Sequence, residues 1–276
     1  MGWELFSQYV RALNEAKPKY FIYENNKSMS KDIRVSIDKA FGFEAVLINS
    51  ALVSAQNRQR LYWVGRRNED GTYSKVNVEQ PADRGILLKD VLDNAVAMRE
   101  KAHAVITSAG RTTEREFFMK NQDNMAAYPV CVAERGRMYC GQPQHYEART
   151  DGKTNTLTSV EKDNRVAEPV KVGYIAYAIE FDDDGKPIKA IGKDGKEITI
   201  YEVKDGKITT KGKQYSIKLK DGFYIIRKLT VSECKRLQTV LEWYEFPVSN
   251  TRAYKMLGNG WTCEVIAHIL KSLKEA

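Results

Sequence analysis

The chain has 276 residues, of which 42% are hydrophobic, and this is enough for one sizeable core or for one core plus a smaller domain. It contains no apolar run of about 18 residues, and residues 1–7 lack the basic start and apolar run of a secretion signal, so neither a membrane span nor export is predicted. The net charge of +8 makes a polyanion a natural partner, although many basic proteins bind no nucleic acid.

The four cysteines, Cys131, Cys140, Cys234 and Cys263, are scattered along the chain. None of them forms a Cys-x-x-Cys pair, and the three histidines do not cluster near them. The sequence therefore predicts no metal site. Reduced thiols of this kind are typical of a cytoplasmic protein, so we expect this chain in the cytoplasm.

The first 98 residues alternate between helical and strand patterns. Apolar residues spaced by three and four indicate helices, and short apolar runs indicate buried strands. In chain order we expect a helix at 4–16, a strand at 20–23, a helix from Ser30 to Phe41, strands at 45–49 and 61–65, and a helix at 86–96. This order is typical of an α/β domain, and the first strand has the apolar character of a parallel sheet.

The sequence changes character from about residue 99 onward. Residues 99–170 are polar with poor periodicity, whereas residues 171–226 alternate and contain four Asp-Gly pairs. Asp-Gly between alternating runs is a strong hairpin signal, so we expect a β-meander with lysines on its outer face. Helical patterns return at 232–241 and 262–274. The predicted division of the chain is 1–98, 99–226 and 227–276.

Glu24 is the first candidate for chemistry, because it directly follows the apolar run at 20–23. A carboxylate in that position lies at the carboxyl edge of the sheet, where ligands of open α/β sheets bind. Such a group can accept or donate a proton at a substrate nitrogen. The alternative interpretation is a capping or solvated glutamate.

Gln56, Arg58 and Arg60 are the second set of candidates, and they lie between two predicted strands. Alternate residues of an extended segment share one face. One glutamine and two arginines on one face offer many donors for base carbonyls and phosphates. The alternative is a solvated strand edge whose charges deter aggregation.

Two segments near the C-terminus complete the candidates. Residues 227–238 carry Thr230 and Glu233 at the spacing of a capping box, which is typical of a helix start. Residues 254–261 carry a Gly-Asn-Gly loop before the last helix, whose backbone amides would be open to an anion or a carboxylate. Each segment alone is weak evidence of function, because such sequences are common.

In this order, the four segments resemble the motifs of the DNA cytosine-5 methyltransferase family, in its bacterial and phage form. Phe-Ile-Tyr-Glu-Asn is similar to the Glu-Asn-Val motif, with Asn26 in place of the valine, and Gln-Asn-Arg-Gln-Arg is similar to Gln-x-Arg-x-Arg. The segments at 227–238 and 254–261 match the two later motifs, and residues 155–158 resemble a further segment of these enzymes. The resemblance covers most of the chain.

The resemblance implies an α/β fold with an incomplete Rossmann-like methyltransferase sheet. Residues 99–226 would form an inserted β-rich target-recognition domain that reads double-stranded DNA through the major groove. Glu24 would hold a flipped cytosine at its ring nitrogen and amino group, and Arg60 would contact the cytosine carbonyl oxygen. Gln56 and Arg58 would support this site. The S-adenosylmethionine site would be completed from the C-terminal side by Asn259, Gly260 and Trp261.

Two motifs of the family do not occur in these 276 residues. One is Phe-x-Gly-x-Gly, which binds S-adenosylmethionine, and the other is Pro-Cys, whose thiolate attacks carbon 6 of the base. Cys131 and Cys140 lie after the Gln-x-Arg-x-Arg segment and are poor candidates for that nucleophile. Cys234 and Cys263 lie on predicted helices, where we expect them to be packing residues.

Three hypotheses follow from these observations. In the first, the chain is one subunit of a split methyltransferase, inactive alone, and a second chain with the N-terminal half covers an apolar sheet edge and supplies the missing motifs. In the second, it is a catalytically dead remnant that still binds DNA. In the third, it is an unrelated basic DNA-binding protein whose motifs coincide by chance. We favour a methyltransferase of a bacterial or phage-infected cell.

Overall fold

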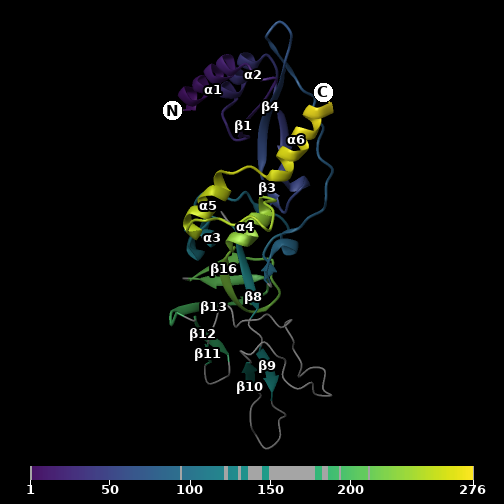
Figure 1. The fold of residues 1–276 in the computed structure, drawn as a ribbon. Helices are drawn as coiled ribbons and strands as arrows, with labels where there is room; N and C mark the ends of the chain where they lie inside the picture. The colour runs from purple at the N-terminus through teal and green to yellow at the C-terminus, as the bar shows by residue number, and fades with distance from the viewer. Residues whose placement is uncertain are drawn as a thin grey trace, which may run out of the picture.

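The computed structural model describes residues 2–93, 95–120, 124–129, 132–135, 145–148, 178–181, 186–192, 194–210 and 212–275. Cys131, Cys140 and the segment at 155–158 lie outside these residues. Figure 1 shows helices α1, α2 and α6 around the strands that carry the N-terminal motifs, with a separate group of strands beyond α4 and α5. In the described ranges, no helix has the length and apolar character needed to cross a membrane.

The first sheet is antiparallel, with β4 between β1 and β2. Its strands are β1 (Tyr20–Asn26), β2 (Val46–Asn49), β4 (Gln59–Arg67) and β5 (Tyr73–Lys75), and β5 pairs with β4. The prediction of a parallel pairing for β1 is therefore wrong. The two strands β1 and β2 run in the same direction, but β4 returns between them and pairs with both.

Helices cover both faces of this sheet, which explains why its strands look like those of a parallel sheet. Helices α1 (Gly2–Ala16) and α2 (Lys31–Phe41) pack on one face around Leu61 and Trp63 of β4. Helix α6 (Cys263–Glu275) packs on the other face against Tyr62 and Val64. Because successive β4 side chains are buried on opposite faces, the strand is apolar throughout and shows no alternation.

The second large sheet is built from the middle of the chain in the order β11-β12-β13-β16-β8-β6, with β14 and β15 attached to β13. All of its described pairings are antiparallel. The strands are β6 (Val96–Ala97), β8 (Met125–Pro129), β11 (Ala178–Phe181), β12 (Pro187–Ile191), β13 (Glu197–Lys204), β14 (Lys207–Thr210), β15 (Lys213–Ser216) and β16 (Gly222–Lys228). The meander predicted from the Asp-Gly pairs is confirmed for the described part of this region.

The turn between β13 and β14 shows how the sequence specifies this meander. Asp205 and Gly206 both have positive φ, at 51° and 65°, and Lys204 pairs with Lys207 across them. A two-residue hairpin with two left-handed residues matches the twist of the strands, and Asp-Gly favours it. The second sheet also includes β6 and the last two residues of β16, which lie just outside the predicted boundaries of 99 and 226. The division into domains at these residues stays a prediction.

Short elements connect the two sheets. They are the 3₁₀ helices Ser50–Leu52 and Leu88–Val91, the strands β3 (Gln56–Asn57) and β7 (Ala102–His103), and the helices α3 (Glu114–Lys120), α4 (Val231–Leu237) and α5 (Asn250–Asn259). Strands β9 (Val132–Arg135) and β10 (His145–Ala148) pair with each other in a separate hairpin, which Figure 1 shows on the far side of the second sheet. The helix predicted at 86–96 is wrong, because Leu88 and Val91 enter the core from a single 3₁₀ turn and Val96 begins β6.

Helix starts agree with the sequence to different degrees. Thr230 and Glu233 form the expected capping box at α4, in which each side chain accepts from the other residue's backbone amide. Ser30 occupies the N-cap position of α2, but its side chain makes no capping hydrogen bond. Helix α4 is shorter than the predicted 232–241, since Thr239 has a positive φ of 52° and breaks the helix.

Candidate functional site

Glu24 and Arg60 form an ion pair on neighbouring strands. Residues 24 and 60 lie on β1 and β4, and the Arg60 Nε lies 2.9 Å from the Glu24 Oε1. Their side chains are 20% and 17% exposed, so the pair is accessible from solvent. Glu24 lies within β1, opposite Tyr62, and not after its end as the sequence suggested.

The remaining atoms of this pair can meet a ligand. Arg60 Nη1 donates to the carbonyl oxygen of Gln59 at 2.9 Å. In the described structure, Oε2 of Glu24 and Nη2 of Arg60 have no hydrogen bond to protein. A carboxylate oxygen beside a guanidinium donor fits a planar group that presents a donor and an acceptor on one edge. Beside the pair, burial and the negative charge of Glu24 raise the pKa of Tyr62, so its hydroxyl stays protonated.

Arg58 points into the protein and holds backbone carbonyl groups. The side chain is buried, and its guanidinium donates to the carbonyl oxygens of Val105 at 3.1 Å, Gly258 at 3.3 Å and Gly260 at 2.8 Å. The carbonyls of Gly258 and Gly260 lie at the C-terminal end of α5, where a helix presents partial negative charge. Burial and then the positive charge of Arg60 lower the pKa of Arg58 to about 10, which leaves it charged at neutral pH.

Gln56 belongs to a fully buried polar network. Its Nε2 donates to the carbonyl oxygen of Leu237 and to Gln238 Oε1, the latter at 2.9 Å. Its Oε1 accepts from the backbone amide of Val105 at 3.1 Å, and Thr262 Oγ1 donates to Gln238 Oε1 at 3.0 Å. Gln56 and Arg58 therefore connect the N-terminal motifs to residues about two hundred positions later, whereas Arg60 is the member of the motif that reaches an accessible site.

Asn259 is the last residue of α5, and Gly260 and Trp261 follow it in the loop before α6. The sequence suggested open backbone amides here, but the Gly260 amide donates to the carbonyl oxygen of Met256 at 2.8 Å and ends α5. That expectation is wrong for Gly260, because its amide completes the last turn of the helix. The side chains of Asn259 and Trp261 are exposed and remain available to a ligand.

Three residues that support this region did not stand out in the sequence as functional. Gln238 and Thr262 are fully buried members of the network around Gln56. At Gly258, an added Cβ would lie 2.4 Å from backbone atoms of Ile106 and Thr107, so only glycine allows α5 to approach this loop so closely. Gln238 ends the segment at 227–238 and Gly258 lies within the segment at 254–261, but only the fold shows which residues they contact.

A large apolar hollow lies beside Trp261. It has a volume of about 620 Å³ and is bordered by the last turn of α5, the start of α6 and the loop after α4. We call it the apolar hollow. Its lining residues are Gln238, Val240, Leu241, Trp243, Tyr244, Phe246, Met256, Leu257, Gly260, Trp261, Cys263, Ile266, Ala267 and Leu270. Trp243 is 76% exposed, which is unusual for the largest apolar side chain.

The cysteines of the described residues contribute no nucleophile to the Glu24–Arg60 site. Cys234 is buried in the core, as expected of a packing residue. Cys263 is exposed and lines the apolar hollow, so the expectation that it packs in the interior is wrong. Its sulfur is nevertheless partly shielded from water, and this desolvation raises the pKa of Cys263. No cluster of three metal-binding side chains occurs among the residues that the structure describes.

The arrangement can be compared with known proteins. A family model described as C-5 cytosine-specific DNA methylase matches residues 2–275. The chain belongs to this family. The C-5 cytosine DNA methylase chain is 24% identical over 292 residues to the Type II methyltransferase M1.ScrFI of Lactococcus lactis subsp. cremoris, an alignment that covers 98% of the chain and 55% of the relative. It therefore spans about half the length of that curated relative.

Two solved structures are also similar to this methylase chain. One is the Entamoeba histolytica methyltransferase EhMeth, with 13% identity, a TM-score of 0.43, and coverage of 96% of this chain and 68% of the other. The second is a putative DNA modification methyltransferase encoded within a prophage of E. coli, with 14% identity, a TM-score of 0.44, and coverage of 99% and 73%.

Proposed function

We propose that this methylase chain is part of a DNA (cytosine-5-)-methyltransferase, which transfers a methyl group from S-adenosylmethionine to carbon 5 of a flipped cytosine. The observation that carries the proposal is the accessible ion pair between Glu24 and Arg60, at 2.9 Å on adjacent strands. A target base must leave the duplex before it can reach such a pair. Double-stranded DNA is therefore the proposed partner, in the cytoplasm of a bacterial or phage-infected cell.

The two side chains are complementary to one edge of cytosine. The Glu24 carboxyl would form hydrogen bonds with the ring nitrogen N3 and with the amino group of the base. A proton shared between the carboxyl and N3 would make carbon 6 more electrophilic. The Arg60 guanidinium would donate to the carbonyl oxygen O2. Gln56 and Arg58 act as positioning residues in this proposal, because their hydrogen bonds fix the strand that carries Arg60.

The residues at the C-terminal end of α5 and just after it suit part of an S-adenosylmethionine molecule. The exposed Trp261 ring lies beside the apolar hollow, where it can pack against a flat ring, and the Asn259 amide can bond a hydroxyl or a ring nitrogen. Gly260 offers no amide donor to a ligand, because its amide donates to the carbonyl oxygen of Met256; it contributes only its backbone position. S-adenosylmethionine would supply the methyl group and a good leaving group at its sulfonium.

We further propose that a second chain, an N-terminal methyltransferase half, supplies the cofactor loop and the Pro-Cys nucleophile. Neither motif occurs in this sequence. The apolar hollow supports the proposal, since Leu241, Trp243 and Leu270 are all largely exposed around it. A surface of this kind marks a protein contact more often than a solvent-facing region.

Transfer of label from tritiated S-adenosylmethionine into duplex DNA tests the proposal. We expect no label from the chain alone, and label once a separately made half carrying Phe-x-Gly-x-Gly and Pro-Cys is added. In that mixture, Glu24→Gln should lower the rate by about 100-fold or more, as for loss of a general acid. Glu15→Gln, which removes an ion-paired glutamate on α1, is the matched control and should change little.

Other outcomes would identify the alternatives. Label from the chain alone would overturn the need for a second chain and would make Cys131 and Cys140 the residues to replace first. DNA binding without label in any mixture would favour the catalytically dead remnant. A rate that is unchanged by Glu24→Gln would contradict the assigned role of the ion pair.

A further inference from the structure

The lysines of the second sheet fall into two groups according to their partners. Lys186, Lys189 and Lys196 form ion pairs, with Glu202 at 2.6 Å, Glu197 at 3.4 Å and Asp194 at 2.9 Å. These pairs lie on β12, on β13, in the turn between them and, for Lys186, directly before β12. The second group follows along the chain, and its exposed members have no ion pair among the described residues; it comprises Lys204, Lys207, Lys213, Lys218 and Lys220.

The second group surrounds a two-stranded ribbon, β14 and β15, which we call the lysine ribbon. One face of the ribbon is fixed to the protein core, because Ile208 is fully buried and Tyr215 packs beside it. The opposite face is exposed and entirely polar. Its cross-strand pairs are Lys207 with Ser216 and Thr209 with Gln214.

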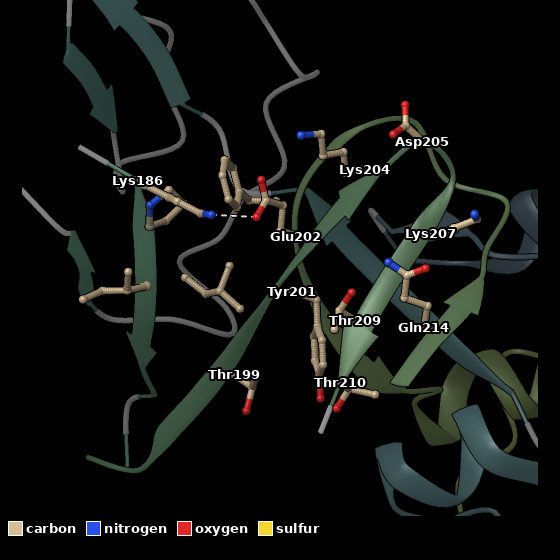
Figure 2. Close-up of a pocket in the computed structure, with 14 residues that line it drawn as sticks. Lys186, Thr199, Tyr201, Glu202, Lys204, Asp205, Lys207, Thr209, Thr210 and Gln214 are labelled. Atoms are coloured by element: carbon tan, nitrogen blue, oxygen red, sulfur yellow. Dashed lines mark hydrogen bonds and ion pairs between the residues drawn. The ribbon is translucent and has the colours of Figure 1, made fainter. Parts of the chain in front are cut away.

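The polar face of the lysine ribbon borders a groove of about 640 Å³. In Figure 2, Thr209 and Gln214 lie side by side on their strands, and Lys204 and Lys207 lie toward the Asp205 turn. Hydroxyl and amide groups and unpaired ammonium groups thus line the groove from the ribbon's side, and its other lining residues include the carboxylates of Asp205 and of Glu202, which is paired with Lys186. An unpaired lysine raises the attraction for an anion, whereas a lysine held by a carboxylate does not.

We infer that the lysine ribbon is the element that enters the major groove of the DNA substrate, with Lys204 and Lys207 on phosphates and Thr209 and Gln214 at base edges. This inference rests on the proposed function, since it assumes duplex DNA as the substrate. Two strands about 4.8 Å apart, with their side chains, fit a groove about 12 Å wide. A glutamine amide can bond adenine in two places, and a threonine can contact the methyl group of thymine.

The salt dependence of binding tests the phosphate contacts. Each lysine on a phosphate adds about 0.9 to the slope of log K against log salt concentration. Raising salt from 50 to 200 mM should therefore weaken wild-type binding roughly 12-fold more than binding by Lys204→Ala/Lys207→Ala. The matched control is Lys189→Ala/Lys196→Ala, which removes the same charge from ion-paired positions outside the groove and should leave the slope near that of the wild type.

The probe is a random-sequence duplex of fixed length, with binding measured by fluorescence anisotropy and the thermal unfolding midpoint of every variant recorded. Equal slopes for the two double variants would overturn the inference while leaving DNA binding intact. Absence of any duplex binding by the wild-type chain would overturn both the inference and the proposed DNA partner.

Selection of bound sequences from the random pool tests the base contacts. We expect Gln214→Ala to lose a preference for one base, by about 5- to 150-fold, with its overall salt slope unchanged. Thr209→Ala should weaken the preference at a neighbouring position. Identical selected sequences for the wild type and both variants would show that the ribbon does not read bases, and would overturn that part of the inference.

Discussion

Arg58 gives the sharpest test of the difference between the two arginines of the motif. Replacing Arg58 by alanine removes a buried cation. It takes away the side-chain donor of the Val105 and Gly258 carbonyl oxygens, and it leaves the Gly260 carbonyl with only Gln238 Nε2 at 3.3 Å. A hydrogen bond to a charged group contributes about 1.5 to 3 kcal/mol, and an unsatisfied buried carbonyl costs about 1 to 3 kcal/mol. Removing the buried charge also removes the cost of taking it out of water, and this offsets part of the loss. We therefore expect the free energy of unfolding to fall by about 3 to 5 kcal/mol.

Arg60→Ala is the matched control for this prediction. It removes a partly exposed ion pair with Glu24, for which a change of about 0 to 1 kcal/mol is expected. Urea unfolding followed by circular dichroism measures both changes. If Arg58→Ala folds too weakly to measure, Arg58→Lys keeps the charge but cannot reach all three carbonyls, and it should be intermediate. Equal small losses for Arg58→Ala and Arg60→Ala would refute the supporting role of Arg58.

Three further predictions use the same unfolding assay. Gly258→Ala should cost about 1 to 3 kcal/mol, because the new Cβ would meet the backbone of Ile106 at 2.4 Å; an unchanged midpoint would mean that the loop yields freely. Glu233→Ala should lower the free energy of unfolding by about 3 to 5 kcal/mol, because it removes the carboxylate oxygens that accept from Arg227 Nη1 at 2.6 Å and Nη2 at 2.7 Å. A loss below about 1 kcal/mol would count against this role of Glu233. Burial raises the pKa of Tyr9 from 10 to about 12, so the protonated hydroxyl contributes stability that is present below pH 10 and is lost as the pH rises toward 12. Tyr9→Phe should reduce this alkaline loss, and identical profiles of unfolding free energy against pH for the two proteins would contradict the prediction.

Much of the local structure follows from the sequence alone. Helices α1 and α6 have apolar residues at helical spacing, and each has a face that packs on the first sheet. The Asp205-Gly206 turn forms a hairpin because the residue types favour its positive φ angles. These features depend on neighbours within a few residues, so a single sequence carries the information.

The errors arise where distant residues decide the outcome. Burial of β4 by helices on both faces removes the alternation that would have indicated its antiparallel pairing. The segment from Leu88 to Val91 is apolar, but β6 directly after it pairs with β8 and prevents a longer helix. Local propensity is a weak guide where such tertiary contacts compete with it.

The candidate site shows the same limit at the level of single residues. The spacing of Gln56, Arg58 and Arg60 is readable in the sequence, and so is its likeness to a family motif. Their separate tasks depend on Leu237, Gly260 and the neighbouring strand β1, which no local pattern connects to them. The assignments of Glu24 and Arg60 to base binding, and of residues 259–261 to cofactor binding, remain predictions.

The buried network around Gln56 has a consequence for how such a chain can change. Residues 54–58 and 237–262 close on one another directly, through Ser54, Gln56 and Arg58. These two segments form a closed frame, and the long stretch of chain between them begins and ends at that frame. Because the cost of closing a loop rises by only about 0.6 kcal/mol for each doubling of its length, the frame tolerates inserts of very different size.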